Sequence, residues 1–144
     1  MERMRRKKRT RILVEGDAAL RSRLSRDIQN RHEVVTVAEP SAGLVMTTMR
    51  ETARQSRFYL GEVMVTEAKV RIGESLGLGI IAGDESAAAF DLAVIDAAFN
   101  AGVAPLDEWL PALEAEERRI AEREASEDAR ILQTRVDFQT MDTE

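Results

Sequence analysis

Four carboxylates in the middle of the chain, Glu62, Glu67, Asp91 and Asp96, are of the residue type that general acid–base catalysis uses. None of them has a sequence neighbour that fixes its role as an acid or a base. The chain has one histidine, His32, and no cysteine, so thiolate nucleophiles and cysteine-held iron–sulfur clusters are excluded, and a structural zinc site nearly so. A Ser-His-Asp triad would need His32, but nothing in the surrounding QNRHEVV orients its imidazole. The sequence therefore predicts no catalytic residue, no metal ligand and no self-contained active site.

A second candidate for chemistry is GLGIIA, residues 77–82, which matches the dinucleotide-binding fingerprint G-x-G-x-x-[GA]. That fingerprint requires a strand before the glycines and a helix that begins inside the motif. Here Ile80 and Ile81 are typical of a strand, and the signal for a helix comes after them. We therefore interpret the glycines as turn residues of a sheet and predict no bound cofactor.

Charge is distributed unevenly behind a net charge of −5, with basic residues at the start of the chain and acidic residues late in it. A basic N-terminus can bind a polyanion such as nucleic acid. No aromatic residues interleave it and no recognised nucleic-acid fold follows, so the sequence disfavours nucleic acid as a partner. The basic residues are Arg3, Arg5, Arg6, Lys7, Lys8, Arg9 and Arg11.

Length and composition indicate one globular domain spanning residues 1–144. The chain is 44% apolar and 33% charged, which is typical of a soluble protein rather than a disordered one. No apolar stretch approaches the length of a membrane span, and the apolar run after the basic start is too short for a signal peptide. The absence of cysteine gives no support for secretion, so we expect a cytoplasmic protein.

The pattern of apolar residues predicts an α+β fold. Residues 1–30 are expected to be helical, and residues 33–83 to form an antiparallel meander of about four or five strands, with one turn around Pro40 and Gly43. Two helices follow over residues 84–133. The first is expected to be capped by Asp84 or Ser86 and to end at Gly102, and the second is long and charged. Residues 134–144 are expected to form an extended C-terminal tail.

Glu62 differs from the other charges of the predicted sheet. Residues 66–72 alternate strictly, so Glu67 belongs to an ordinary solvated face. Glu62 instead has Leu60 and Met64 as its neighbours at a spacing of two. Because an unpaired carboxylate among apolar groups is costly, we predict that Glu62 lies at a subunit contact or makes a buried hydrogen bond. The alternative is a surface residue at the end of a strand.

The apolar C-terminal segment follows a charged helix and is predicted to dock onto another chain. Its alternating pattern suits an extended segment laid on a surface or on the edge of a sheet. The alternative is that the tail folds back on its own sheet. The predicted interface residues are Arg135, Val136, Asp137, Phe138 and Met141, with Phe138 as the anchor.

Five segments in this order resemble the PhnG subunit of the bacterial carbon–phosphorus lyase system. The resemblance covers roughly residues 33–141 and does not account for the basic N-terminus. Its segments are AGLVM at 42–46, FYLGEVMVTEAKVRI at 58–72, GLGIIAGD at 77–84, DAAF at 96–99 and TRVDFQTM at 134–141.

The resemblance implies an accessory subunit of a complex that metabolises alkylphosphonates. It implies partners of the H, I, J and L types, the I type being the closest. The complex would make ribose 1-alkylphosphonate 5-triphosphate from MgATP and a phosphonate. S-adenosylmethionine and an iron–sulfur cluster would reside on the J-type subunit. The competing hypothesis is a free-standing module that binds polyanions through its N-terminus, and self-association of the isolated chain is a further expectation.

Overall fold

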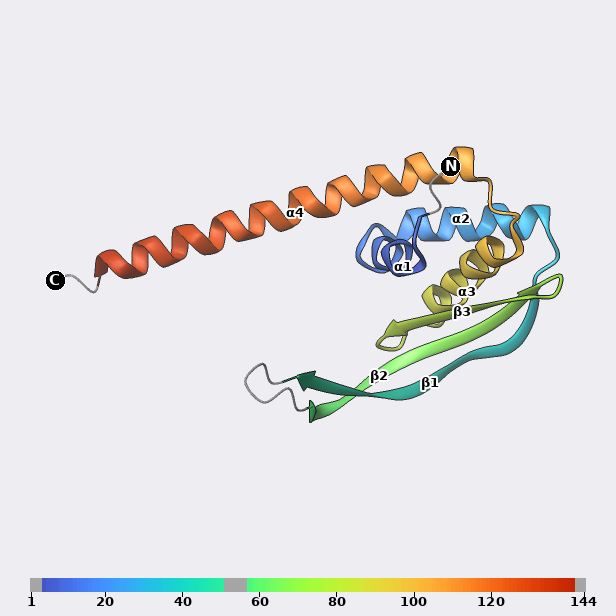
Figure 1. The fold of residues 1–144 in the computed structure, drawn as a ribbon, viewed down its shortest axis with the longest axis horizontal. Helices are drawn as coiled ribbons and strands as arrows, with labels where there is room; N and C mark the ends of the chain where they lie inside the picture. The colour runs from blue at the N-terminus through green and yellow to red at the C-terminus, as the bar shows by residue number, and fades with distance from the viewer. Residues whose placement is uncertain (1–3, 51–56, 142–144) are drawn as a thin grey trace. The chain divides into compact units, whose positions relative to one another are not determined.

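A computed structural model describes residues 4–50 and 57–141, with side chains described for residues 4–48 and 60–133. The chain divides into two compact units, one formed by Met1–Asp17 with Asp107–Glu144 and the other by Ala18–Leu106. The described elements are α1 (Arg6–Glu15), α2 (Ala18–Arg31), β1 (Val35–Arg50), β2 (Arg57–Ile72), β3 (Ser75–Ala82), α3 (Ser86–Ala101) and α4 (Leu106–Met141) (Figure 1). This is the predicted α+β class, with helices before and after the sheet.

The sheet of the second unit has three antiparallel strands in the order β1-β2-β3, so the prediction of four or five was wrong. The extra strands came from the turn expected around Pro40 and Gly43. In the structure β1 runs straight through both residues, and its pairing with β2 slips between Ala38 and Ser41. Proline lacks the N–H that a central strand needs, but an edge strand with a local bulge tolerates it.

One face of this sheet is covered by α3, which in turn packs against α2 (Figure 1). The predicted alternation is confirmed: Ala68, Val70 and Ile72 are buried, whereas Glu67 and the basic residues beside it are exposed. Gly77 and Gly79 are not turn residues. They lie inside β3 and face α3, where a side chain on either glycine would overlap the backbone of the helix.

The ends of α3 were predicted in part. Gly102 ends the helix in the left-handed conformation, as expected from its residue type. The N-cap position is occupied by Glu85, not by the predicted Asp84 or Ser86, and it makes no side-chain capping bond. Instead the Thr66 hydroxyl on β2 donates to the Gly83 carbonyl at 2.6 Å and accepts from the Glu85 amide at 3.0 Å. A sheet residue therefore secures the turn into this helix.

In the first unit α1 contacts α4 around residues 117–124, where Lys8 pairs with Glu117 and Ile12 lines a groove with Ile120. Trp109, Leu113 and Ile120 of α4 are buried, as is Ile12 of α1. Beyond this pairing residues 121–133 of α4 are all exposed, and Ile131 and Leu132 are the large apolar residues among them. The prediction that the late acidic stretch is a long charged helix is confirmed.

The extended tail predicted over residues 134–144 was wrong as far as the structure describes it, because α4 continues to Met141. The alternation of Val136 and Phe138 suggested a strand, but no glycine or proline follows Pro111 to stop the helix. Residues 142–144 lie outside the described residues. The side chains of Arg135, Val136, Asp137, Phe138 and Met141 lie outside them as well.

Candidate functional site

Glu62 lies in the middle of β2, opposite Met46 of β1. It is exposed, and within the described part of the chain its carboxylate has no ion pair or hydrogen bond. A buried hydrogen bond within this chain and a position at the end of a strand are therefore both wrong. The prediction that Glu62 lies at a subunit contact stays a prediction.

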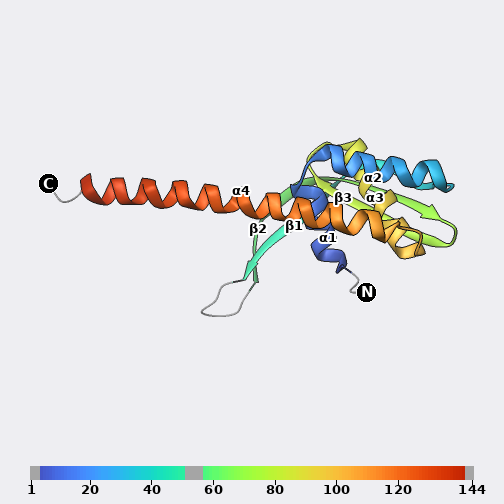
Figure 2. The same cartoon turned by 90° about the horizontal axis from the view of Figure 1, so that it is seen from above.

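The strands around Glu62 extend beyond the rest of the sheet. β3 pairs with β2 only between Val65 and Ile72, whereas β1 and β2 remain paired as far as Arg50 and Arg57. Figures 1 and 2 both show these two strands running on past the end of β3. We call residues 44–48 and 60–64 the ribbon. Within the unit Ala18–Leu106, the described residues place no third strand beside it and no helix over its faces.

Large apolar side chains cover the ribbon and are exposed. Leu44, Met46 and Met64 share the face of Glu62, with exposed fractions of 67%, 65% and 49%. Val45 and Val63 are paired on the opposite face and are exposed as well. Exposed apolar groups gathered in this way mark a surface of interaction.

The other carboxylates considered for acid–base chemistry do not converge. Glu67 points to the exposed face of the sheet, away from α3. Asp96 is buried on α3, where its Oδ2 accepts the amide of Leu78 at 2.9 Å. This bond satisfies a strand amide, so its role is structural. No group of three or more metal-binding side chains occurs in the part of the chain that the structure describes.

Asp91 of α3 is half-buried against α2. Burial raises the pKa of this carboxyl above 3.8, and the hydrogen bond with Ser25 and the positive charges of Arg21 and Arg26 oppose that rise. A carboxyl with a raised pKa can serve as a general acid or base. Its neighbours are one hydroxyl and two guanidinium groups, which hold the carboxyl in place, so we assign it to the packing of α2 on α3.

His32 lines a hollow together with Glu33, Arg71, Glu74 and Ser75. These residue types would suit a hydrolytic triad. Among the described residues, however, no side-chain hydrogen bond joins the histidine to the serine or to either acid. The arrangement lacks the nucleophile–base contact that such chemistry starts from.

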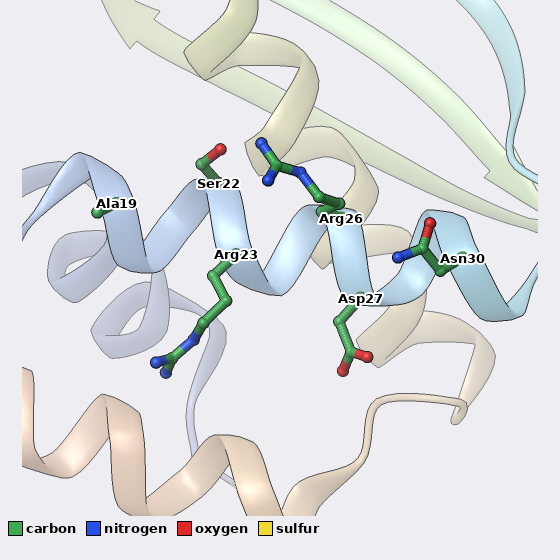
Figure 3. Close-up of a pocket in the computed structure, with 6 residues that line it drawn as sticks. All are labelled: Ala19, Ser22, Arg23, Arg26, Asp27 and Asn30. Atoms are coloured by element: carbon green, nitrogen blue, oxygen red, sulfur yellow. The ribbon is translucent and has the colours of Figure 1, made fainter.

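A second hollow follows the outer surface of α2 and is lined by Ala19, Ser22, Arg23, Arg26, Asp27 and Asn30. Figure 3 shows that the guanidinium groups of Arg23 and Arg26 point to opposite sides of the helix. Asp27 is already paired with Arg31 at 3.0 Å. The two arginines thus do not converge on one anion, and we assign no ligand to this surface.

The basic N-terminal segment contacts the acidic part of α4 within the first unit. Lys8 forms an ion pair with Glu117 at 3.2 Å, and Arg11 forms ion pairs with Glu15 at 3.1 Å and with Glu124 at 2.7 Å. Three carboxylates therefore already occupy two of the cations that a polyanion would need. This observation weakens the polyanion-binding hypothesis.

Glu116 of α4 is a structurally important position that the sequence did not reveal. It is only 6% exposed, and its Oε1 accepts the backbone amide of Asp17 at 3.0 Å. Its Oε2 accepts Arg119 at 3.1 Å. The carboxylate thereby fixes the chain where α1 has ended. Nothing distinguishes this glutamate from its acidic neighbours in the sequence, because its partner is 99 positions away.

Comparison with known proteins relates this chain to proteins of phosphonate metabolism. The chain matches the family model described as phosphonate metabolism protein PhnG over residues 4–142, which includes the basic N-terminal segment. It is 38% identical over 121 residues to the alpha-D-ribose 1-methylphosphonate 5-triphosphate synthase subunit PhnG of Rhizobium meliloti (strain 1021), covering 79% of this chain and 73% of that relative. No helix in the described residues is long and apolar enough to cross a membrane. The match confirms the resemblance found in the sequence and extends it toward the N-terminus.

Proposed function

Because the chain belongs to the PhnG family of phosphonate metabolism proteins, we propose that it is an accessory subunit of a synthase that forms ribose 1-alkylphosphonate 5-triphosphate from MgATP and an alkylphosphonate. The observation that carries this proposal is the family match, which spans residues 4–142 rather than one motif. The Rhizobium relative is named as a subunit of such a synthase. A subunit acts together with other chains, and we propose those of the H, I, J and L types, with the I type closest.

The accessory role is supported by the chemistry of the side chains. The carboxylates of Asp91 and Asp96 are engaged in packing and in a strand contact, and Glu67 is solvated. The chain has no cysteine, so it cannot supply thiolate ligands for an iron–sulfur cluster. MgATP, S-adenosylmethionine and the cluster are therefore proposed to bind to other subunits.

Reconstitution tests this proposal. A tagged chain is co-expressed with the H-, I-, J- and L-type subunits of the same source, and the purified material is analysed by size-exclusion chromatography. Adenine release from MgATP and methylphosphonate is then measured with and without this chain. We expect a stable complex and no adenine release by the chain alone. Adenine release by the pure chain that a single substitution in it abolishes would overturn the accessory role.

The competing polyanion-binding function makes a different prediction. A chain that bound nucleic acid through its N-terminus would do so with an affinity that falls steeply as salt rises. The ion pairs of Lys8 and Arg11 with α4 favour the opposite result, which is no measurable binding at physiological salt. Fluorescence anisotropy with a labelled duplex at several salt concentrations separates the two functions.

A further inference from the structure

The ribbon continues the face of the sheet that α3 covers. Thr66, Ala68 and Val70 lie on that face and are buried, and Met64 and Glu62 follow them at a spacing of two along β2. Side chains at this spacing point to the same side of a strand. The apolar face therefore passes from a covered part to a part that no described residue of the unit Ala18–Leu106 covers. A two-stranded ribbon alone is only marginally stable in water, so a cover would also stabilise it.

The charge at the centre of the uncovered face restricts what the cover can be. Glu62 lies across from Met46, beside Met64, and diagonal to Leu44. A purely apolar cover would bury a bare carboxylate, which is costly. A second copy of this chain, docked face to face, would place two Glu62 carboxylates in one apolar layer, where like charges repel.

We propose that Leu44, Met46 and Met64 around Glu62 form a docking surface for a different protein, which presents an apolar surface with one arginine or lysine side chain that pairs with Glu62. This inference rests on the proposed function, since the partner is taken to be another subunit of the synthase. Methionine side chains are flexible and adapt to the shape of a partner. Four side chains are too few for a complete interface of about 800 Å² on each protein. They form its anchor, and neighbouring surfaces complete the contact.

Charge reversal at Glu62 tests the assignment. We expect Glu62→Lys to weaken binding to the other subunits by at least about tenfold, because it places two positive charges together in a desolvated contact. Glu67→Lys is the matched control: it makes the same charge change on the same strand, but on the opposite face. We expect its affinity to stay within about twofold of the original. Leu44→Ser provides an independent test of the apolar part, with at least about a tenfold loss expected.

Binding is measured by titrating the purified variants into the preassembled remaining subunits, and urea unfolding of each isolated variant checks the fold. Because Leu44 and Glu62 are exposed in the single chain, the unfolding midpoints of Leu44→Ser and Glu62→Lys should equal that of the unaltered chain. Tight binding by both folded variants would overturn the inference and leave the proposed function standing. Failure of the unaltered chain to bind would overturn both. Dimerisation of the isolated chain that Leu44→Ser abolishes would identify the occupant as a second copy, which overturns the assignment of a different protein.

Discussion

Replacing Gly79 with alanine should damage the contact between β3 and α3. A Cβ atom at this position would lie 2.7 Å from the Ala93 amide nitrogen and 3.0 Å from the Ala89 carbonyl carbon, and it would overlap the Ala89 carbonyl oxygen. All three obstructing atoms belong to the backbone of α3. A flexible side chain could rotate away, but a helix backbone has to move as a whole.

The size of the effect follows from the rigidity of that contact. Ala89 and Ala93 are completely buried, so the displacement of α3 would open contacts on both sides of the helix. Overpacking a core typically costs 1–3 kcal/mol, and a backbone obstruction belongs at the upper end, about 3 kcal/mol. The lower entropy of the unfolded alanine chain offsets about 0.4–1 kcal/mol. We therefore expect a net loss of about 2 kcal/mol in the free energy of unfolding.

Urea unfolding followed by circular dichroism measures this loss. In thermal unfolding the same loss corresponds to a decrease in Tm of about 4–8 °C. Gly43→Ala is the matched control in the same sheet. Its Cβ would meet only the Val65 Cγ2 atom, at an ordinary 3.7 Å, so we expect a change within about 0.5 kcal/mol. An unchanged urea midpoint for Gly79→Ala would refute the close approach of helix and strand.

Three further predictions concern both units. Burial raises the pKa of Asp91, so the folded chain loses stability as pH rises above 3.8 and through the raised pKa. Asp91→Asn removes this titration, so its stability relative to the original chain should increase as pH rises from about 4. A relative decrease in urea titrations would contradict the assignment. Glu116→Ala should lower the free energy of unfolding by about 1–2 kcal/mol, because the Asp17 amide loses its buried acceptor. The control Glu117→Ala removes an exposed ion pair and should change stability by less than about 1 kcal/mol. Equal unfolding midpoints for the two variants would exclude the special role of Glu116. Deletion from Gln133 onward should leave a protein that unfolds cooperatively but no longer assembles with the other subunits. Phe138→Ala should weaken binding to them by about 2 kcal/mol. Loss of the cooperative transition in the shortened chain would instead place this segment in the core.

Local signals in the sequence predicted the elements whose structure depends on near neighbours. The strict alternation of residues 66–72 gave the correct faces of β2, and Gly102 was correctly predicted to end α3. The turn predicted at Pro40 was wrong, because a proline indicates a turn unless the strand is known to lie at the edge of the sheet. The strand order that decides this is a property of the whole fold.

The contacts that matter for the candidate site depend on residues far apart in the sequence. The role of Gly79 requires Ala89 and Ala93 on a helix that lies across from it. Glu62 could be singled out from its apolar neighbours along one strand, but the cross-strand Met46 could be assigned only once the register was known. The alternation of residues 134–141 was misread, because the same residues can lie along a helix.

The pairing of α1 with α4 has a consequence for how the chain is made. Arg11 and Glu124 are separated by 113 positions, and at roughly 5–20 residues per second a ribosome needs roughly 6–23 s to proceed from one to the other. The unit formed by Ala18–Leu106 is continuous and can fold during this interval. Ile12 lines a groove with Ile120, so its apolar side chain cannot be buried against α4 before Ile120 has been synthesised. The nascent chain therefore carries α1 without its partner until this part of α4 has been synthesised, and during that period the exposed apolar side chains of α1 can bind a chaperone.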